Sequence, residues 1–140
     1  MTKPQNFILS TDYAALKNDG KATLSVTLPS SIVIPASTTQ TWTSTVDVGT
    51  AGASIRSRIT STKDGLTWFG NTVSYYYSTG STVGGFSADY FIYVSVSRVG
   101  ATSVQLTVFM PNQYGSSMTV SSGLARTITA VFATFIPPVP

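Results

Sequence analysis

Hydrophobic and polar residues alternate one by one along most of this chain. That period is typical of a β-strand with one buried face, whereas a helical period is almost absent. The clearest case is residues 22–28, where aliphatic side chains alternate with Ser and Thr. Alternation and short apolar runs predict further strands at residues 32–34, 39–48, 54–61, 66–69, 72–78, 89–99, 102–110, 118–121 and 124–136.

Turn residues separate these segments. Asn-Asp-Gly at residues 18–20 and Lys-Asp-Gly at residues 63–65 predict tight turns, because these residue types adopt positive φ at low cost. Residues 79–87 (TGSTVGGFS) are rich in Gly and small polar side chains, so they predict a long loop. The one helical candidate is short and covers residues 11–17.

Many short strands with frequent turn signals predict an all-β fold. We expect an antiparallel β-sandwich of about eight to ten strands, either immunoglobulin-like or a jelly roll. The chain shows no linker, internal repeat or shift in composition, so residues 1–140 are expected to form a single domain. Residues 1–10 and 134–140 are the candidates for terminal arms, and the second of these ends in a proline-rich stretch.

The composition argues against an enzyme. Ser and Thr account for 42 of the 140 residues, while Cys, His and Glu are absent. Disulfides, thiolate metal sites, Cys or His catalysts and a Ser-His-Asp triad are therefore excluded. A carboxylate pair would have to come from the five Asp residues, and Asp19 and Asp64 each precede a Gly in a predicted turn. We expect no catalytic residue, no cofactor and no metal site.

The chain carries few charges, with 9% charged residues against about 25% in ordinary domains. Its net charge of +3 is too small and too scattered to predict direct nucleic-acid binding. No apolar stretch is long enough for a membrane span, and the start lacks the features of a signal peptide. Arg56 and Arg58 share one strand face, and we expect them to pair with Asp of another subunit or to remain solvated.

Aromatic residues are the main candidates for a contact site. Neighbouring strand residues face opposite sides, so Tyr75 and Tyr77 are predicted to share one face and Tyr76 the other. One tyrosine face and Trp42 would fill the sandwich core, which leaves the other face as an exposed contact surface. Alternatively, Trp42, Trp68, Phe69 and the three tyrosines would form a platform for a sugar ring, with Asn71 or Asp64 binding its hydroxyl groups. Phe86 of the predicted loop is a further candidate for an interface or ligand contact.

Both ends of the chain have a distinctive sequence. Residues 3–8 (KPQNFI), 12–13 (DY) and 134–138 (TFIPP), with the alternating body rich in Ser and Thr, resemble small all-β proteins encoded among the virion and tail genes of tailed bacteriophages and prophages. The resemblance implies a structural part of the particle that assembles in many copies and has no catalytic residues to carry over.

We therefore expect a tail-associated virion component, made in the host cytoplasm, that forms a homo-oligomer and contacts other virion proteins. The alternative is a receptor-binding or carbohydrate-binding β-sandwich that recognises a host cell-surface glycan for attachment. That module would use Trp68, residues 75–77 and the predicted loop at residues 79–87.

Overall fold

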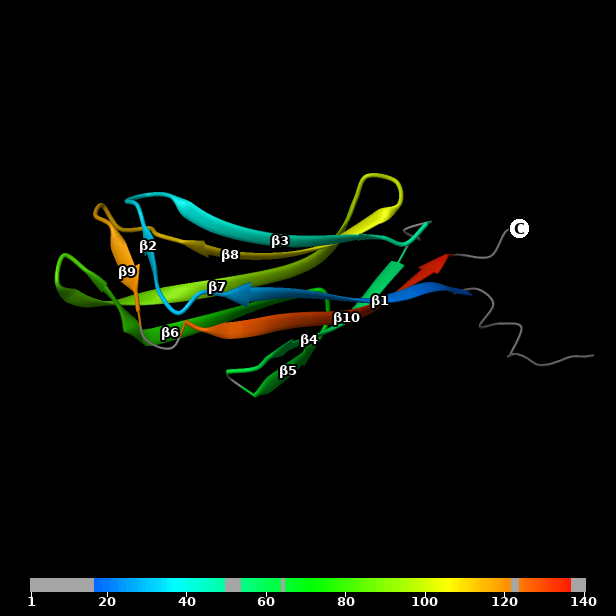
Figure 1. The fold of residues 1–140 in the computed structure, drawn as a ribbon, viewed down its shortest axis with the longest axis horizontal. Helices are drawn as coiled ribbons and strands as arrows, with labels where there is room; N and C mark the ends of the chain where they lie inside the picture. The colour runs from blue at the N-terminus through cyan, green and yellow to red at the C-terminus, as the bar shows by residue number, and fades with distance from the viewer. Residues whose placement is uncertain (1–16, 50–53, 64, 122–123, 137–140) are drawn as a thin grey trace, which may run out of the picture.

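The computed structural model describes residues 17–49, 54–63, 65–121 and 124–136. These residues form ten β-strands and no helix, which confirms the predicted all-β class (Figure 1). The strands are β1 (Lys17–Leu28), β2 (Ile32–Ile34), β3 (Thr39–Asp47), β4 (Ser54–Ser61), β5 (Leu66–Phe69), β6 (Thr72–Val83), β7 (Phe86–Val99), β8 (Ser103–Pro111), β9 (Met118–Val120) and β10 (Arg126–Ile136).

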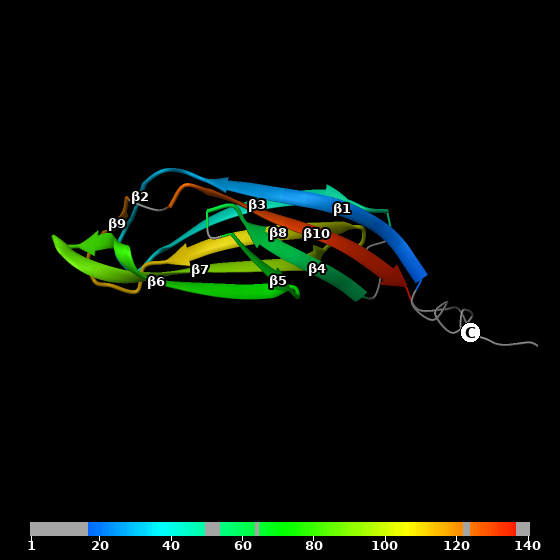
Figure 2. The ribbon, with the colours of Figure 1, turned by 90° about the horizontal axis from the view of Figure 1, so that it is seen from below.

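Two antiparallel sheets lie face to face as a β-sandwich (Figures 1 and 2). The four-stranded sheet has the order β1-β10-β4-β5, and the six-stranded sheet has the order β2-β9-β6-β7-β8-β3. The first part of the chain pairs with the last in a nested manner: β1 with β10, β2 with β9, and β3 with β8. This nesting of three pairs resembles a jelly roll more than an immunoglobulin order, which pairs the first strand with the second, but β4 pairs with β10 and β5 rather than with β7.

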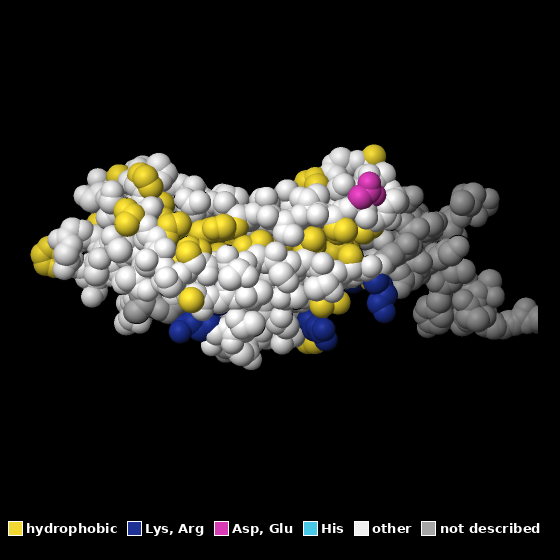
Figure 3. Space-filling model, in the orientation of Figure 1, with side chains coloured by type: hydrophobic (Ala, Val, Ile, Leu, Met, Phe, Trp, Pro, Cys, Tyr) yellow, Lys and Arg dark blue, Asp and Glu magenta, His cyan; other side chains and the backbone are white. Residues whose placement is uncertain are grey.

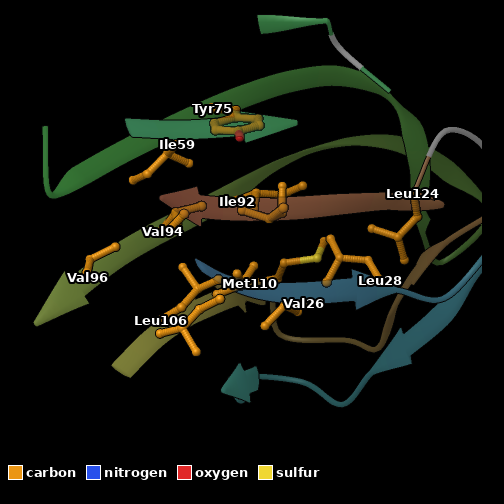
Figure 4. Close-up of a cluster of buried hydrophobic side chains, with 14 of the residues drawn as sticks. Val26, Leu28, Ile59, Tyr75, Ile92, Val94, Val96, Leu106, Met110 and Leu124 are labelled. Carbon is orange, nitrogen blue, oxygen red and sulfur yellow. The ribbon is translucent and has the colours of Figure 1, made fainter. Parts of the chain in front are cut away.

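The core lies between the sheets and follows the alternation of the sequence. Along β8, Val104, Leu106, Val108 and Met110 are fully buried, while the residues between them are half-exposed. In Figure 4, aliphatic side chains of β1 point toward those of β7 and β8 across the interior. Each fully buried aliphatic side chain contributes about 1.5–3 kcal/mol, so this one cluster provides most of the driving force for folding.

The predicted long loop at residues 79–87 is wrong. β6 continues to Val83 and β7 begins at Phe86, and these two residues pair directly. Gly84 and Gly85 form the turn between them, with φ angles of 59° and 86°, as a two-residue type I′ hairpin requires. The glycines therefore mark a tight turn rather than a long loop, and a register shift between Tyr77 and Ser81 accommodates the small residues before it.

Two predictions near the chain ends also change. Residues 18–20 do not form a turn but lie inside β1, where the ladder shifts register between Asn18 and Gly20. Residues 134–136 of the predicted C-terminal arm belong to β10, because they pair with β1. The rest of that arm, the N-terminal arm at residues 1–10 and most of the helical candidate lie outside the described residues. The predicted hairpin at residues 63–65 is confirmed by the pairing of β4 with β5.

Candidate functional site

The tyrosine run of β6 divides its side chains between the two faces of the six-stranded sheet, as predicted. Tyr75 is buried and Tyr77 half-buried on the inner face, while Tyr76 is 56% exposed on the outer face. The pleat alone produces this split, because successive side chains of a strand point in opposite directions. Two separate groups of aromatic rings result, one in the core and one on the surface.

The inner aromatic row consists of Trp68, Tyr75, Tyr77 and Tyr90. Trp68 of β5 stacks on Tyr75 of β6 with ring centroids 4.5 Å apart, which joins the two sheets. Tyr77 stacks on Tyr90 of β7 at 4.8 Å and 15°. The rings of this row pack against one another and against the core, so Trp68, Tyr75 and Tyr77 do not form the sugar platform that was the alternative prediction.

A buried cation completes the inner row. Arg126 of β10 is 3% exposed, and its Nη1 donates a hydrogen bond of 2.7 Å to the Tyr77 hydroxyl. The guanidinium carbon also lies 4.6 Å from the centroid of the same ring, a cation–π contact. Arg126 was not among the predicted site residues, although it has the same parity along β10 as the buried Ile128 and Ala130.

Asn71, the other residue assigned to the sugar platform, has a structural role. Its amide Nδ2 donates to the carbonyl oxygen of Ile55, and its Oδ1 accepts a hydrogen bond of 2.7 Å from the Ser57 hydroxyl. Its carbonyl oxygen accepts from the backbone N–H of Val96. Asn71 thereby connects the four-stranded sheet to the six-stranded sheet. Asp64 lies outside the described residues.

The outer aromatic row consists of Tyr76, Phe91, Tyr93 and Phe109, on the outer face of β6, β7 and β8. Tyr76 faces Phe91 across the β6–β7 ladder with centroids 5.2 Å apart, and Phe91 is 6.0 Å from Tyr93. Tyr93 faces Phe109 across the β7–β8 ladder at 5.0 Å and 13°. Two nearly parallel rings this close overlap face to face, so each covers one face of the other and leaves its edges to solvent.

Polar groups hold the Tyr76 end of this row. The Tyr114 hydroxyl accepts a hydrogen bond from the backbone N–H of Asp89 and donates to its carbonyl oxygen, at 3.2 and 3.3 Å. The buried Asn112 accepts from the Tyr114 N–H and so fixes the loop that carries this ring. A hydrogen bond with the Asp89 side chain, together with partial burial and the Asp89 charge, raises the pKa of the exposed Tyr76 phenol.

Two shallow hollows flank the row. One lies beside Tyr93 and Phe109 and is lined by the hydroxyl groups of Thr72, Ser74 and Ser95. The other lies at the opposite end, between Phe91 and the polar side chains of Asp89, Gln113 and Tyr114. Both hollows combine an aromatic ring with hydrogen-bonding groups, and neither contains a basic side chain.

The outer faces of the two sheets carry opposite charge in the part of the chain that the structure describes. Outward side chains of β3, β6, β7 and β8 include Asp47 and Asp89 and no Lys or Arg. On the four-stranded sheet, Lys21, Arg56 and Arg58 surround a hollow beside Phe69, which is 84% exposed. Figure 3 shows Lys and Arg side chains toward the side of β1, β4 and β5.

The residues predicted as contacts therefore occupy separate places. Arg56 and Arg58 share the outer face of β4, as predicted, on the sheet opposite the outer aromatic row. Phe86 is 78% exposed beside the β6–β7 turn. Only Tyr76 lies in the outer aromatic row, and its other members were missed because each looked like an ordinary polar-face position of an alternating strand.

Within the described ranges, no three His, Cys, Asp or Glu side chains gather as a metal site, and no helix is long and apolar enough to cross a membrane. Comparisons with known proteins do not extend this picture. No family model, curated protein or solved structure matches the chain.

Proposed function

We propose that this protein is a structural component of a bacteriophage virion, associated with the tail, which acts in many copies through contacts with itself and with other virion proteins. The proposal assigns the chain no catalytic role and no cofactor. The observation that carries it is the outer aromatic row, which places four large rings side by side on the outside of the molecule.

Aromatic residues are enriched where proteins meet, because each one buries a large area at a small cost in side-chain entropy. Phe91, Tyr93 and Phe109 already stack on one another, so this part of the row offers a partner mainly ring edges, whereas Tyr76 is tilted against Phe91 and more than half exposed. A sugar ring stacks on an open aromatic face, whereas a protein surface packs equally well against edges. The geometry therefore favours a protein partner over a glycan.

The opposite charges of the two outer faces support contacts between copies. A contact between the face that carries Asp89 and the face that carries Arg56 and Arg58 would be electrostatically complementary. Such a contact uses different surfaces on the two copies, so it repeats and builds a ring or a filament rather than stopping at a dimer. Multi-copy assembly of this kind is what a tail component requires.

The alternative function is a receptor-binding or carbohydrate-binding module. The hollow between Phe91, Asp89 and Gln113 favours it, because aromatic and polar side chains line this hollow together. In this alternative the same outer face would bind a glycan of the host surface, and the protein would attach the particle to the cell.

The substitution Tyr76→Ala separates these functions. Tyr76 is more than half exposed and makes one ring contact, so its loss will change the free energy of unfolding by about 1 kcal/mol or less. In the assembly account the dissociation constant of the oligomer rises about tenfold or more, as for an aromatic interface residue. Sedimentation velocity measures the assembly, and urea unfolding measures the stability.

Phe86→Ala is the matched control, because Phe86 is a more exposed aromatic residue that lies outside the row. We expect it to leave the oligomer unchanged. An unchanged Tyr76→Ala oligomer would contradict the proposal, and loss of retention on immobilised glycans by the same variant would establish the alternative.

A further inference from the structure

The outer edge of β3 is an open strand edge. β3 is the last strand of the six-stranded sheet and pairs with β8 without a register shift from Thr39 to Asp47. Just beyond its two ends, the Val48 N–H donates a hydrogen bond to the Thr102 carbonyl oxygen, and the Thr38 carbonyl oxygen accepts one from the Asn112 N–H. Both of these backbone groups therefore point toward β8. Hydrogen bonds alternate along an antiparallel ladder, so the even-numbered residues of β3 bond to β8. The odd-numbered residues from Thr39 to Asp47 point their N–H and C=O groups away from it.

Each of the other edge strands carries a feature that discourages pairing with another chain. β1 has a register shift and an exposed Lys21, β2 has three residues with prolines on both sides, and β5 has only four residues. Short edges, lysine, proline and bulges are the devices by which proteins protect a sheet edge. β3 has nine residues, no Lys, Pro or bulge, and a single charge at its last position.

The inner side of this edge is incompletely covered. Trp42 and Val46 of β3 pack against the core but remain half-buried. In Figure 3, hydrophobic side chains form a band along the side of the sandwich between β3 and β1. A strand added beside β3 would cover these side chains, and this burial would stabilise the extended sheet together with the new main-chain hydrogen bonds.

We infer that β3 pairs antiparallel with β3 of a second copy, so that two six-stranded sheets join into one. In a register centred on Thr43, the odd-numbered residues, whose N–H and C=O groups face the open edge, lie opposite one another. Thr43 pairs with Thr43, Thr41 with Thr45, and Thr39 with Asp47. The two Asp47 carboxylates then lie at opposite ends of the joint. On the inner side, the two Trp42 rings are diagonal neighbours, which is within reach of aromatic side chains.

This inference deepens the proposed function and rests on it, since it names one of the contacts through which copies would assemble. The joint is isologous, so it closes as a pair, whereas the contact between oppositely charged faces repeats. The pairing would also place the two outer aromatic rows on one continuous surface, because both rows lie on the outer face of the joined sheet.

The substitution Thr43→Pro tests the pairing. Proline removes the central outward N–H and leaves the β3–β8 hydrogen bonds intact, because edge strands tolerate proline at such a position. Thr23→Pro is the matched control: Thr23 is also exposed, and its N–H also points outward from an edge strand, β1. Light scattering should show at least a tenfold loss of association for Thr43→Pro and none for Thr23→Pro.

A cysteine variant provides a second test of the pairing, which does not depend on whether the proline variant folds. The natural chain has no Cys, so Thr43→Cys introduces a single thiol. Directly opposite residues in a hydrogen-bonded antiparallel pair have Cα atoms about 5.5 Å apart, a distance that a disulfide spans. Under mild oxidation Thr43→Cys should form a covalent dimer, whereas Thr23→Cys should remain mostly uncrosslinked.

The outcomes separate this inference from the proposed function. If the wild-type oligomer forms, Thr43→Pro leaves it intact and Thr43→Cys crosslinks no faster than Thr23→Cys, the edge pairing is overturned and assembly stands. If the wild type is monomeric and Thr43→Cys does not crosslink, both fail. If only a β3-dependent dimer forms and Tyr76→Ala does not weaken it, the edge pairing holds and the role of the outer aromatic row fails.

Discussion

The inner and outer aromatic rows are built from the same residue types on the same strands, yet they have opposite relations to the fold. Tyr75 and Tyr77 lie inside the sandwich, against Trp68, Tyr90 and the buried Arg126. Tyr76, one position away from both, lies outside, against Phe91 and near Asp89. A single step along β6 therefore separates a residue that holds the two sheets together from one that the fold does not need.

The two rows also differ in how far the fold accounts for them. The inner row is explained by burial, because its rings fill the space between the sheets and one bonds a buried cation. The outer aromatic row has no such explanation, since Ser or Thr would suit an outward strand position as well, and most neighbouring outward positions hold them. The four rings on that face are therefore the basis of the proposed contact surface.

The largest expected effect concerns stability. Tyr90→Ala removes a ring that is 2% exposed and leaves a cavity, so it should lower the free energy of unfolding by about 3–5 kcal/mol. Tyr93→Ala, at an outward position of the same strand, should cost about 1.5 kcal/mol or less, because it opens no enclosed cavity and mainly removes stacking on Phe91 and Phe109. Urea unfolding monitored by circular dichroism measures both. Equal losses of unfolding free energy in the two variants would contradict the claim that the fold depends on the inner row and not on the outer aromatic row.

An intermediate effect concerns the buried cation. The coupling free energy between Tyr77→Phe and Arg126→Met in a double-mutant cycle should be about 1–2 kcal/mol, because the hydrogen bond between the Tyr77 hydroxyl and the charged Arg126 is partly buried. Tyr76→Phe combined with Arg126→Met is the matched cycle on the outer face and should show no coupling. A coupling near zero in the first cycle would mean that the contact between Arg126 and Tyr77 adds nothing to stability.

The smallest effect concerns the protonation of Tyr76. Hydrogen bonding with Asp89 raises the pKa of Tyr76 in the folded protein, so the neutral phenol is favoured there. The associated stabilisation is present below the pKa of an unfolded tyrosine, about 10, and is lost as the pH rises through the folded value. Asp89→Asn should lower the pKa of Tyr76.

Phenolate absorbance during an alkaline titration measures this shift, and the difference between the wild type and Tyr76→Phe identifies the Tyr76 signal. The backbone bonds between Asp89 and Tyr114 remain in Asp89→Asn, so the loop should keep its position. If Tyr76 has the same pKa with and without the Asp89 carboxylate, Asp89 does not interact with the Tyr76 phenol, and the prediction is wrong.

The sequence predicted the fold class and most strands because alternation is a local property. It also predicted the split of the tyrosine run and the shared face of Arg56 and Arg58, which depend on the same period. It failed at residues 79–87, where Gly84-Gly85 forms a tight hairpin turn that composition alone does not distinguish from a long loop.

The outer aromatic row could not be predicted in the same way. Its members come from three strands, and only the registers of β6 with β7 and of β7 with β8 bring Tyr76 beside Phe91 and Tyr93 beside Phe109. Register and strand order are long-range properties that a local two-residue period does not contain. For the same reason nothing in the sequence identified β3 as an open edge.

The central claim is that this protein works in many copies, and its mass in solution tests that claim most directly. We would measure the mass of the purified wild type by light scattering on a sizing column over a wide range of concentrations. The account predicts a discrete mass greater than that of two copies of the 14.8 kDa chain, reached as the concentration rises. A mass of one chain at every concentration would contradict it.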